Sequence, residues 1–170
     1  MKRHPAGVAL CAVFALYLAT RLYHLRSLPM FCYEGIYVRW GQMAVHNGNF
    51  LISLTDGKPR LHPLATAPFI AAIKDPLVAG RVCSIVFGAF TVLGVFLLGK
   101  ELDGNRLGVI SAFLYVICPF ALWYDRLALA EGLLLTLFTF AIYFAVKART
   151  SGNLLYLLGA AVASGLALLT

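Results

Sequence analysis

Long apolar runs separated by short polar connections constrain the fold of this chain more than any other feature. An α-helix needs roughly 20 apolar residues to cross the hydrocarbon core of a membrane. The 170-residue chain offers about that length four times and falls just short of it a fifth time. We therefore predict an all-α, polytopic transmembrane helical bundle with spans at residues 6–25, 76–99, 107–124, 127–146 and 154–170.

The composition excludes an ordinary water-soluble globule. Hydrophobic residues make up 61% of the chain and charged residues 12%, with a mean hydropathy of +0.85, whereas a soluble domain is about half apolar and a quarter charged. The formal net charge is +7, but the cations fall in clusters and form no continuous basic face of the kind that nucleic acid needs. We expect membrane lipids, and not nucleic acid, as partners.

The ends of the chain carry two further expectations. No small-x-small cleavage site follows the first apolar run, which favours an uncleaved anchor over a signal peptide. The last run ends without a flanking charge, so we expect residues 1–170 to be a single transmembrane domain and the N-terminal part of a longer protein. The four cysteines show neither a disulfide framework nor a metal-ligand spacing, and we interpret them as packing thiols.

Residues 26–75 form the only long polar segment, and we expect this loop to hold the chemistry. A helical repeat in its first half predicts a short amphipathic helix on the membrane surface, made by Ile36, Trp40, Met43 and Ala44. Asn47-Gly48-Asn49 is expected to end this helix. The apolar residues 64–73 are too few to span a membrane, and they predict a second interfacial or re-entrant helix.

The Lys and Arg counts favour one orientation only mildly. With the N-terminus inside, the cytoplasmic side holds Lys2, Arg3, Lys100, Arg106, Lys147 and Arg149. The other side holds Arg26, Arg39, Lys58, Arg60, Lys74 and Arg126. The short basic flanks predict a multi-pass cell-membrane protein with a cytoplasmic N-terminus and an extracytoplasmic loop at 26–75. The cations of that loop either bind an anion there or are tolerated because long loops cross regardless of charge.

Three acidic residues are candidates for a site because of where they lie. Glu34 opens the predicted surface helix, Asp125 lies at the junction of the third and fourth spans, and Glu131 lies in an apolar run. A carboxylate at membrane depth costs about 2.5 to 3.5 kcal/mol on insertion scales. Glu131 either pairs with Arg81 in the second span or converges with Glu34 on a metal or polar substrate. Asp125 either caps the fourth span or contacts a ligand.

Lys58-Pro59-Arg60-Leu61-His62-Pro63 is the second group of candidates. The prolines stiffen the backbone on both sides of the cations. Two cations and an imidazole at the lipid interface suit a phosphate or pyrophosphate headgroup. The alternative is a loop that lies on the membrane and binds nothing in particular.

These motifs, in this order, resemble the N-terminal half of GT-C-fold glycosyltransferases. The resemblance rests on Tyr33-Glu34-Gly35-Ile36-Tyr37-Val38-Arg39-Trp40, on Asp56-Gly57-Lys58-Pro59-Arg60-Leu61-His62-Pro63, on Pro76-Leu77-Val78-Ala79-Gly80-Arg81 and on Tyr124-Asp125-Arg126 followed by Glu131-Gly132. The closest groups are the protein O-mannosyltransferase-like family (glycosyltransferase family 39) and the bacterial lipid A aminoarabinose transferases. Such enzymes move a sugar from a polyprenyl-phosphate carrier to an acceptor on the outer side of the membrane.

The resemblance implies roles for individual residues. Glu34 matches the second member of an acidic pair that serves as base or binds a divalent metal, and Tyr33 stands where the family usually has Asp. Glu34 or Asp56 would then have to supply the base. Lys58 matches a lysine that contacts the lipid-linked phosphate, although Arg60 replaces a proline, and His62-Pro63 looks like the family's His-Pro. Arg126 and Glu131 match an Arg and an acid near the start of the fourth span.

We therefore predict a polyprenyl-phosphate-sugar-dependent glycosyltransferase that acts on a protein, lipid or glycan acceptor. Its predicted catalytic residues are Glu34, Asp125 and Glu131, its predicted substrate-binding residues are Lys58, Arg60, His62 and Arg126, and Glu34 is the predicted ligand of a divalent metal ion. A non-catalytic lipid-binding or scaffold protein is the main alternative, because Tyr33 replaces an acid. A small transporter is less favoured, since only Arg81 and Glu131 could pair inside the membrane and no internal repeat is visible.

Overall fold

The computed structural model describes residues 5–170, and this part of the chain consists of helices and connections without a strand. The predicted all-α architecture of a helical membrane bundle is confirmed. The helices are α1 (Pro5–Leu22), α2 (Cys32–Asn47), α3 (Ile52–Thr55), α4 (Leu61–Ala72), α5 (Pro76–Ile117), α6 (Pro119–Tyr124), α7 (Glu131–Ser151) and α8 (Leu154–Leu168).

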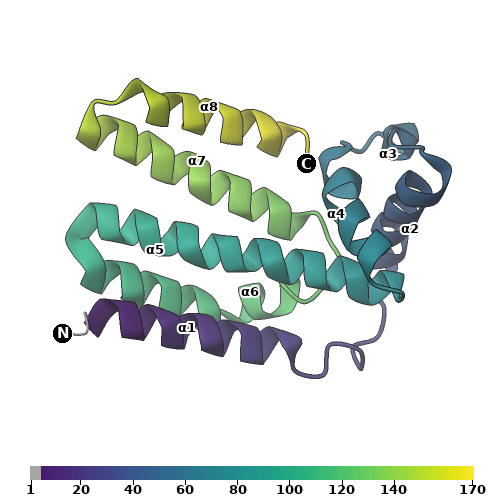
Figure 1. Ribbon diagram of the computed structural model, residues 1–170, viewed down its shortest axis with the longest axis horizontal. Helices are drawn as coiled ribbons and strands as arrows, with labels where there is room; N and C mark the ends of the chain where they lie inside the picture. Colours follow the sequence, from purple (N-terminus) through teal and green to yellow (C-terminus); the bar gives the residue numbers. More distant parts are fainter. Residues whose placement is uncertain (1–4) are drawn as a thin grey trace.

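α5 is a hairpin of two helices. The backbone leaves the helical region at Asp103, with φ of −152°, and at Gly104, with φ of 75°. Glycine adopts such a positive φ without steric cost. The two limbs, residues 76–102 and 105–117, therefore run in opposite directions (Figure 1) and correspond to the second and third predicted spans.

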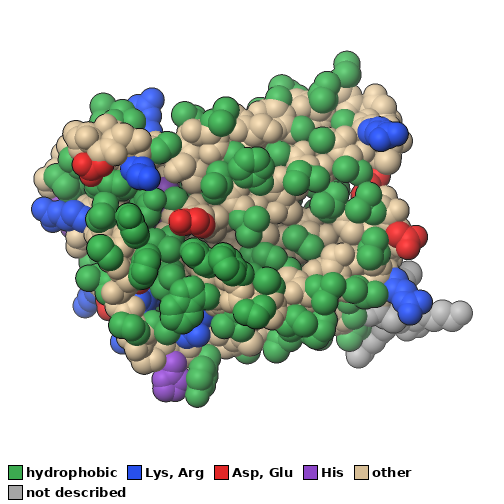
Figure 2. Space-filling view, turned by 180° about the vertical axis from the view of Figure 1, so that it is seen from behind, with side chains coloured by type: hydrophobic (Ala, Val, Ile, Leu, Met, Phe, Trp, Pro, Cys, Tyr) green, Lys and Arg blue, Asp and Glu red, His purple; other side chains and the backbone are tan. Residues whose placement is uncertain are grey.

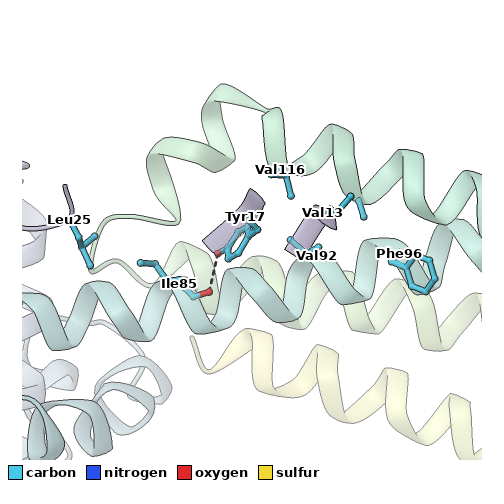
Figure 3. Close-up of a cluster of buried hydrophobic side chains, with 8 residues drawn as sticks. Val13, Tyr17, Leu25, Ile85, Val92, Phe96 and Val116 are labelled. Atoms are coloured by element: carbon cyan, nitrogen blue, oxygen red, sulfur yellow. Dashed lines mark hydrogen bonds between the residues drawn. The ribbon is translucent and has the colours of Figure 1, made fainter. Parts of the chain in front are cut away.

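The long helices lie side by side in one bundle (Figure 1). α5 packs against α1 and α7, and α7 packs against α8. The core between α1 and the limbs of α5 contains the buried side chains of Val13, Tyr17, Val92, Phe96 and Val116 (Figure 3). The Tyr17 hydroxyl, the polar group of this core, donates a hydrogen bond to the Ile85 carbonyl over 2.9 Å.

The outside of the bundle is apolar in the way that a lipid-facing surface is. Figure 2 shows hydrophobic side chains across the middle of one face, with most of the charged side chains toward its two ends. Large hydrophobic side chains such as Phe90, Phe138 and Leu157 are exposed. α5 and α7 are long and apolar enough to cross a membrane by length and composition, and α1, α4 and α8 are shorter apolar helices.

α2, α3 and α4 lie together at one end of the bundle (Figure 1). α2 packs on α4 and α5 and buries Val38, Trp40 and Ala44. It ends at Gly48, whose φ of 64° gives a left-handed C-cap. Both helices predicted in this polar segment are therefore present, and their place relative to a lipid surface stays a prediction.

The predicted junction between the third and fourth spans was wrong, and the first helix ends at Leu22 where the predicted span continued to residue 25. The third span was expected to continue to Tyr124, but the helix stops at Ile117 and a separate helix, α6, begins at Pro119. Proline lacks an N–H donor, and its ring clashes with the preceding turn, so it starts a helix well and interrupts one. The fourth helix begins at Glu131, four residues later than expected, because residues 125–130 form an irregular connection.

The cations separate between the two ends of the bundle as the sequence indicated. Lys147 donates to Glu101 over 2.7 Å near the α5 reversal, which places Lys100 and Arg106 at the same end. Lys58, Arg60 and Arg126 lie in the connections at the other end. Lys2 and Arg3 lie outside the described residues. Which end faces the cytoplasm stays a prediction.

Candidate functional site

A buried ion pair holds the polar segment onto the bundle. Glu34 is in the first turn of α2 and Arg81 is in the first limb of α5, and both side chains are essentially inaccessible to solvent. Two Arg81 nitrogens, Nε and Nη2, donate to the two Glu34 carboxylate oxygens, each over 2.9 Å. This bidentate geometry is the strongest form of a carboxylate–guanidinium pair.

The Glu34 carboxylate is also bonded to the backbone. It accepts from the N–H of Ala128 over 2.8 Å and from the N–H of Phe31, the N-cap of its own helix, over 2.8 Å. Burial on its own raises the pKa of Glu34, but the hydrogen bonds from Arg81, Ala128 and Phe31 outweigh it and lower the pKa below its usual value. Glu34 is therefore a carboxylate whose two oxygens already accept four hydrogen bonds.

Arg81 uses its remaining donors to close the connection between α1 and α2. Its guanidinium donates to the carbonyls of Leu25, Leu28 and Pro29 over 2.7 to 3.2 Å. A pair between Arg81 and Glu131 was one of the two arrangements considered for Glu131, and the structure pairs Arg81 with Glu34 instead. One arginine thus fixes α2, α5 and the segment between α1 and α2.

A second buried cluster surrounds Asp125. The nearest contact between Arg21 and Asp125 is 3.4 Å, and the Tyr115 hydroxyl donates to Asp125 over 2.9 Å. Arg21 also donates to the Val116 carbonyl over 2.7 Å and lies over the ring of Tyr17. Asp125 does not cap α7, because the N-cap of that helix is Ala130. Burial raises the pKa of Asp125, while Tyr115 and Arg21 oppose that shift.

Lys58 and Asp56 face a small aromatic pocket at the same end of the molecule. The pocket has a volume of about 260 Å³ and is lined by Tyr33, Ile36, Tyr37, Trp40, Asp56 and Lys58. Its aromatic side comes from one face of α2, and its charged side comes from the turn between α3 and α4. Lys58 and Arg60 are both exposed on this turn. Glu34 does not line the pocket.

The sequence predicted that His62 is exposed beside Lys58 and Arg60, and this prediction was wrong. The side chain is 2% exposed, and its ring meets that of Tyr37 edge to face, with 4.8 Å between the ring centroids. Burial lowers the pKa of His62 to about 4, although a hydrogen bond with the backbone of Leu129 acts in the opposite direction. At neutral pH the imidazole is therefore an uncharged support behind Tyr37.

A larger pocket of about 500 Å³ brings Asp125 and Glu131 together. Its lining is mostly apolar and also includes Tyr115, Cys118, Phe120, Ala121, Tyr124, Gly132 and Leu135. Glu131 is exposed at the first turn of α7, whereas Asp125 is 2% exposed. Asp125 and Glu131, two of the three predicted catalytic residues, therefore share a pocket, and the third, Glu34, does not line it.

Arg126 lies beside the two buried ion pairs without a carboxylate of its own. It donates to the Tyr23 carbonyl over 2.5 Å, and its Nε is buried with no hydrogen-bond partner among the described residues. Burial lowers the pKa of Arg126, as do the charges of Arg81 and Arg21. The Arg126 guanidinium, which pairs with no carboxylate among the described residues, could bind an anion.

The residues around Glu34 do not fit a divalent metal ion. Both carboxylate oxygens are already bonded to N–H donors, and the Arg81 guanidinium occupies the position that a cation would take. Across residues 5–170, no three His, Cys, Asp or Glu side chains lie close enough together to hold a metal.

Sequence reasoning missed the partners of the buried acids. Arg21 lies within the first predicted span and received no role from the sequence, yet it is fully buried and contacts Asp125. Tyr115 was read as part of a span. An arginine within an apolar run was the available signal, since such a charge is rarely left unpaired.

The fold and these contacts define the chain as a polytopic helical membrane protein whose two buried arginine–carboxylate pairs and aromatic pocket lie at one end of the bundle. The sequence profile of the family described as dolichyl-phosphate-mannose-protein mannosyltransferase matches residues 58–170, and the chain belongs to that family. It is thus a mannosyltransferase-like membrane glycosyltransferase. No curated protein and no solved structure matches the chain significantly. The matched segment begins at Lys58 and includes Arg126 and Glu131.

Proposed function

We propose that the protein transfers a sugar from a polyprenyl-phosphate carrier to a hydroxyl-bearing acceptor on the extracytoplasmic side of the membrane. The observation that carries this proposal is the position of Lys58, which is exposed on a proline-stiffened turn and faces the aromatic pocket. The membership in a mannosyltransferase family supports the type of reaction. The sugar, the carrier and the acceptor are part of the proposal.

Lys58 is proposed to bind the phosphate of the donor, with Arg60 beside it. Both side chains are exposed and lie on either side of Pro59, so their ammonium and guanidinium groups reach solvent at the end of the bundle. A phosphate is bound well by such cations, and arginine adds a bidentate geometry. Arg126, with its unbonded Nε, is the proposed third cation. His62 is proposed to act only through Tyr37, because it is buried behind that ring.

The reaction requires one base and a stabilised leaving group. The acceptor hydroxyl oxygen forms a bond to the anomeric carbon, and the bond from that carbon to the phosphate oxygen breaks with its electron pair going to the phosphate. A carboxylate takes the hydroxyl proton, and the cations stabilise the departing phosphate. This single displacement inverts the anomeric configuration. Retained configuration in the product would rule out the proposed route.

Glu34 takes a positioning role in this proposal in place of the base role predicted from sequence. Its bonds to Arg81, Ala128 and Phe31 join α2, α5 and the connection before α7. These contacts orient the face of α2 that lines the aromatic pocket. Asp125 and Glu131 remain proposed as a second wall, with Glu131 accessible to an acceptor in the larger pocket and Asp125 fixed by Arg21.

The test is transfer of radiolabelled mannose from a polyprenyl-phosphate donor by the full chain in membranes. Lys58→Met should lower transfer at least about tenfold, because it removes a charge-assisted contact with the phosphate. Lys74→Met removes an exposed lysine from the same end of the molecule and should leave transfer unchanged. Absence of transfer by a folded wild-type protein would support the non-catalytic lipid-binding or scaffold alternative.

A further inference from the structure

We propose that Asp56 is the carboxylate that accepts the acceptor's proton, in a pocket whose Tyr33, Tyr37 and Trp40 side receives the transferred sugar ring. This inference rests on the proposed function and assigns the base within it. Asp56 follows α3 directly and lines the same pocket as Lys58, two residues further along the chain.

Three of the other carboxylates either cap a helix or lie at the opposite end of the bundle. The chain has seven Asp and Glu residues, and all of them are among the described residues. Asp75 caps α5 by accepting from the N–H groups of Leu77 and Val78. Glu101 binds Lys147, and Asp103 is in the reversal of α5, so both lie at the opposite end of the bundle.

The two buried acids are poor proton acceptors for a substrate. Glu34 accepts four hydrogen bonds and is fully buried, so an acceptor hydroxyl could reach its oxygens only after the pair with Arg81 had opened. Asp125 is held between Arg21 and Tyr115 and is 2% exposed. A general base must lie within hydrogen-bond reach of the proton that it removes.

Asp56 and Glu131 are the carboxylates that remain, and the position of Lys58 distinguishes them. The base and the phosphate-binding cation act on opposite bonds of the same anomeric carbon, so both must face one sugar ring. Asp56 and Lys58 line one pocket, whereas Glu131 lines the other, mainly apolar pocket. The Asp56 carboxylate makes no hydrogen bond or ion pair with any residue in the range 5–170 and is free to bind a hydroxyl.

The aromatic side of this pocket suits a carbohydrate. Aromatic rings offer apolar faces on which the C–H groups of a sugar pack, and a tyrosine hydroxyl offers a polar tip. Tyr37 meets Trp40 edge to face, with 5.3 Å between centroids, and the buried His62 supports Tyr37 from behind. A volume of about 260 Å³ is slightly below the roughly 300–1,000 Å³ of ordinary ligand pockets, so the pocket suits one sugar ring better than a longer glycan.

The proposed displacement in this pocket transfers one proton and one sugar and needs no redox partner. Asp56 takes the proton as the acceptor oxygen bonds to the anomeric carbon, and the bond to phosphate breaks. The phosphate leaves with the electron pair and stays paired with Lys58. Asp56 then returns the proton to water, so no oxidant, reductant or other co-reactant is consumed.

The first experiment compares Asp56→Asn, Asp56→Glu and Asp103→Asn in the mannose-transfer assay with the full chain. Loss of a general base typically lowers the rate by 10²- to 10⁴-fold, so Asp56→Asn should lower kcat at least about 100-fold with donor KM changed less than about threefold. Asp56→Glu should restore part of the rate, and Asp103→Asn should match wild type. Wild-type rates in Asp56→Asn, or a loss confined to Glu131→Gln or Glu34→Gln, would overturn the assignment.

A binding measurement separates this inference from the proposed function. The chain has two tryptophans, Trp40 and Trp123. In a Trp123→Phe background, a short-chain polyprenyl-phosphate mannose should quench Trp40 fluorescence, and Asp56→Asn should bind it equally well while failing to transfer. Quenching without transfer by the Trp123→Phe parent would reject the proposed activity. Transfer by that parent without a change in Trp40 fluorescence would reject this pocket as the sugar site.

Discussion

At the scale of single residues, the site depends on buried charges whose partners come from distant parts of the chain. Glu34 pairs with Arg81, 47 positions away, and Asp125 pairs with Arg21. Removing one partner from such a pair leaves an unpaired buried charge and destabilises the folded protein by about 3–5 kcal/mol. Asp56 and Lys58, the charged residues that line the aromatic pocket, are exposed instead. A group that contacts the substrate has to be accessible in this way.

We expect His62 to make the protein less stable in acid. The unfolded imidazole has a pKa of 6.5 and the folded one has a pKa of about 4 because of burial. Above pH 6.5 both states are neutral, so His62 has no effect there. Between pH 6.5 and 4 the unfolded state binds the proton and the folded state does not, so stability falls as pH falls, by up to about 3 kcal/mol. Thermal unfolding in detergent at pH 7.5 and 4.5 measures this loss.

The matched variants for this measurement are His62→Gln and His46→Gln. His46 is exposed near the end of α2, so its replacement should leave the acid-induced loss of wild type intact. His62→Gln should reduce that loss. An equal loss in wild type and His62→Gln would contradict the buried, neutral state of the His62 ring.

At the scale of the element, glycines set how closely the helices approach each other. In the α5 hairpin, a Cβ on Gly99 would lie 2.9 Å from the Cα of Gly108, and one on Gly108 would lie 2.6 Å from the Phe96 carbonyl oxygen. Backbone at such a distance cannot move aside as a side chain can. The hairpin therefore requires glycine at these positions for its packing, in addition to the positive φ at Gly104.

Gly108→Ala should destabilise the protein although alanine is the better helix former. The intrinsic preference favours Ala by about 1 kcal/mol, but overpacking against the Phe96 carbonyl costs about 1–3 kcal/mol. Gly165→Ala in α8 meets no atom within 4 Å and should be neutral or mildly stabilising. Melting temperatures of the two variants give the comparison, and a Gly108→Ala protein as stable as Gly165→Ala would contradict the close approach of the limbs.

At the scale of the whole molecule, the polar connections between the long helices lie at the two ends of the bundle (Figure 1). The segment before α5, the connection between α6 and α7 and the end of α8 lie together (Figure 1), and the Leu61 N–H donates to the Leu169 carbonyl over 2.9 Å. The α5 reversal and the turn between α7 and α8 lie at the opposite end (Figure 1). The aromatic pocket and the larger pocket therefore share one end of the bundle.

The basic flanks predict that the end bearing Lys58 is extracytoplasmic. After replacement of Cys11, Cys32, Cys83 and Cys118, a membrane-impermeant maleimide should label Lys58→Cys in intact cells. Arg149→Cys, which is exposed near the other end, should react only after the cells are permeabilised. The reverse pattern would place Lys58 in the cytosol and reject the extracytoplasmic transfer proposed here.

The sequence by itself determined the fold class and the family resemblance. Apolar runs near membrane length define helices locally, and Asn47-Gly48-Asn49 ended α2 where expected, since both signals act within a few residues. Pro119 was a further local signal, because a proline interrupts a helix, and it could have predicted the end of the third helix before α6. The motif around Lys58 could be read because its residues are adjacent in the chain.

Only the tertiary structure decided which charges meet. The pairing of Arg81 with Glu34, and not with Glu131, depends on how far each helix is rotated and shifted against its neighbours, which periodicity does not specify. The same packing buries His62 and leaves Asp56 open to the pocket. Side chains from separate helices come into contact through the packing of the whole bundle, and for that reason the roles of the acids could not be assigned along the sequence.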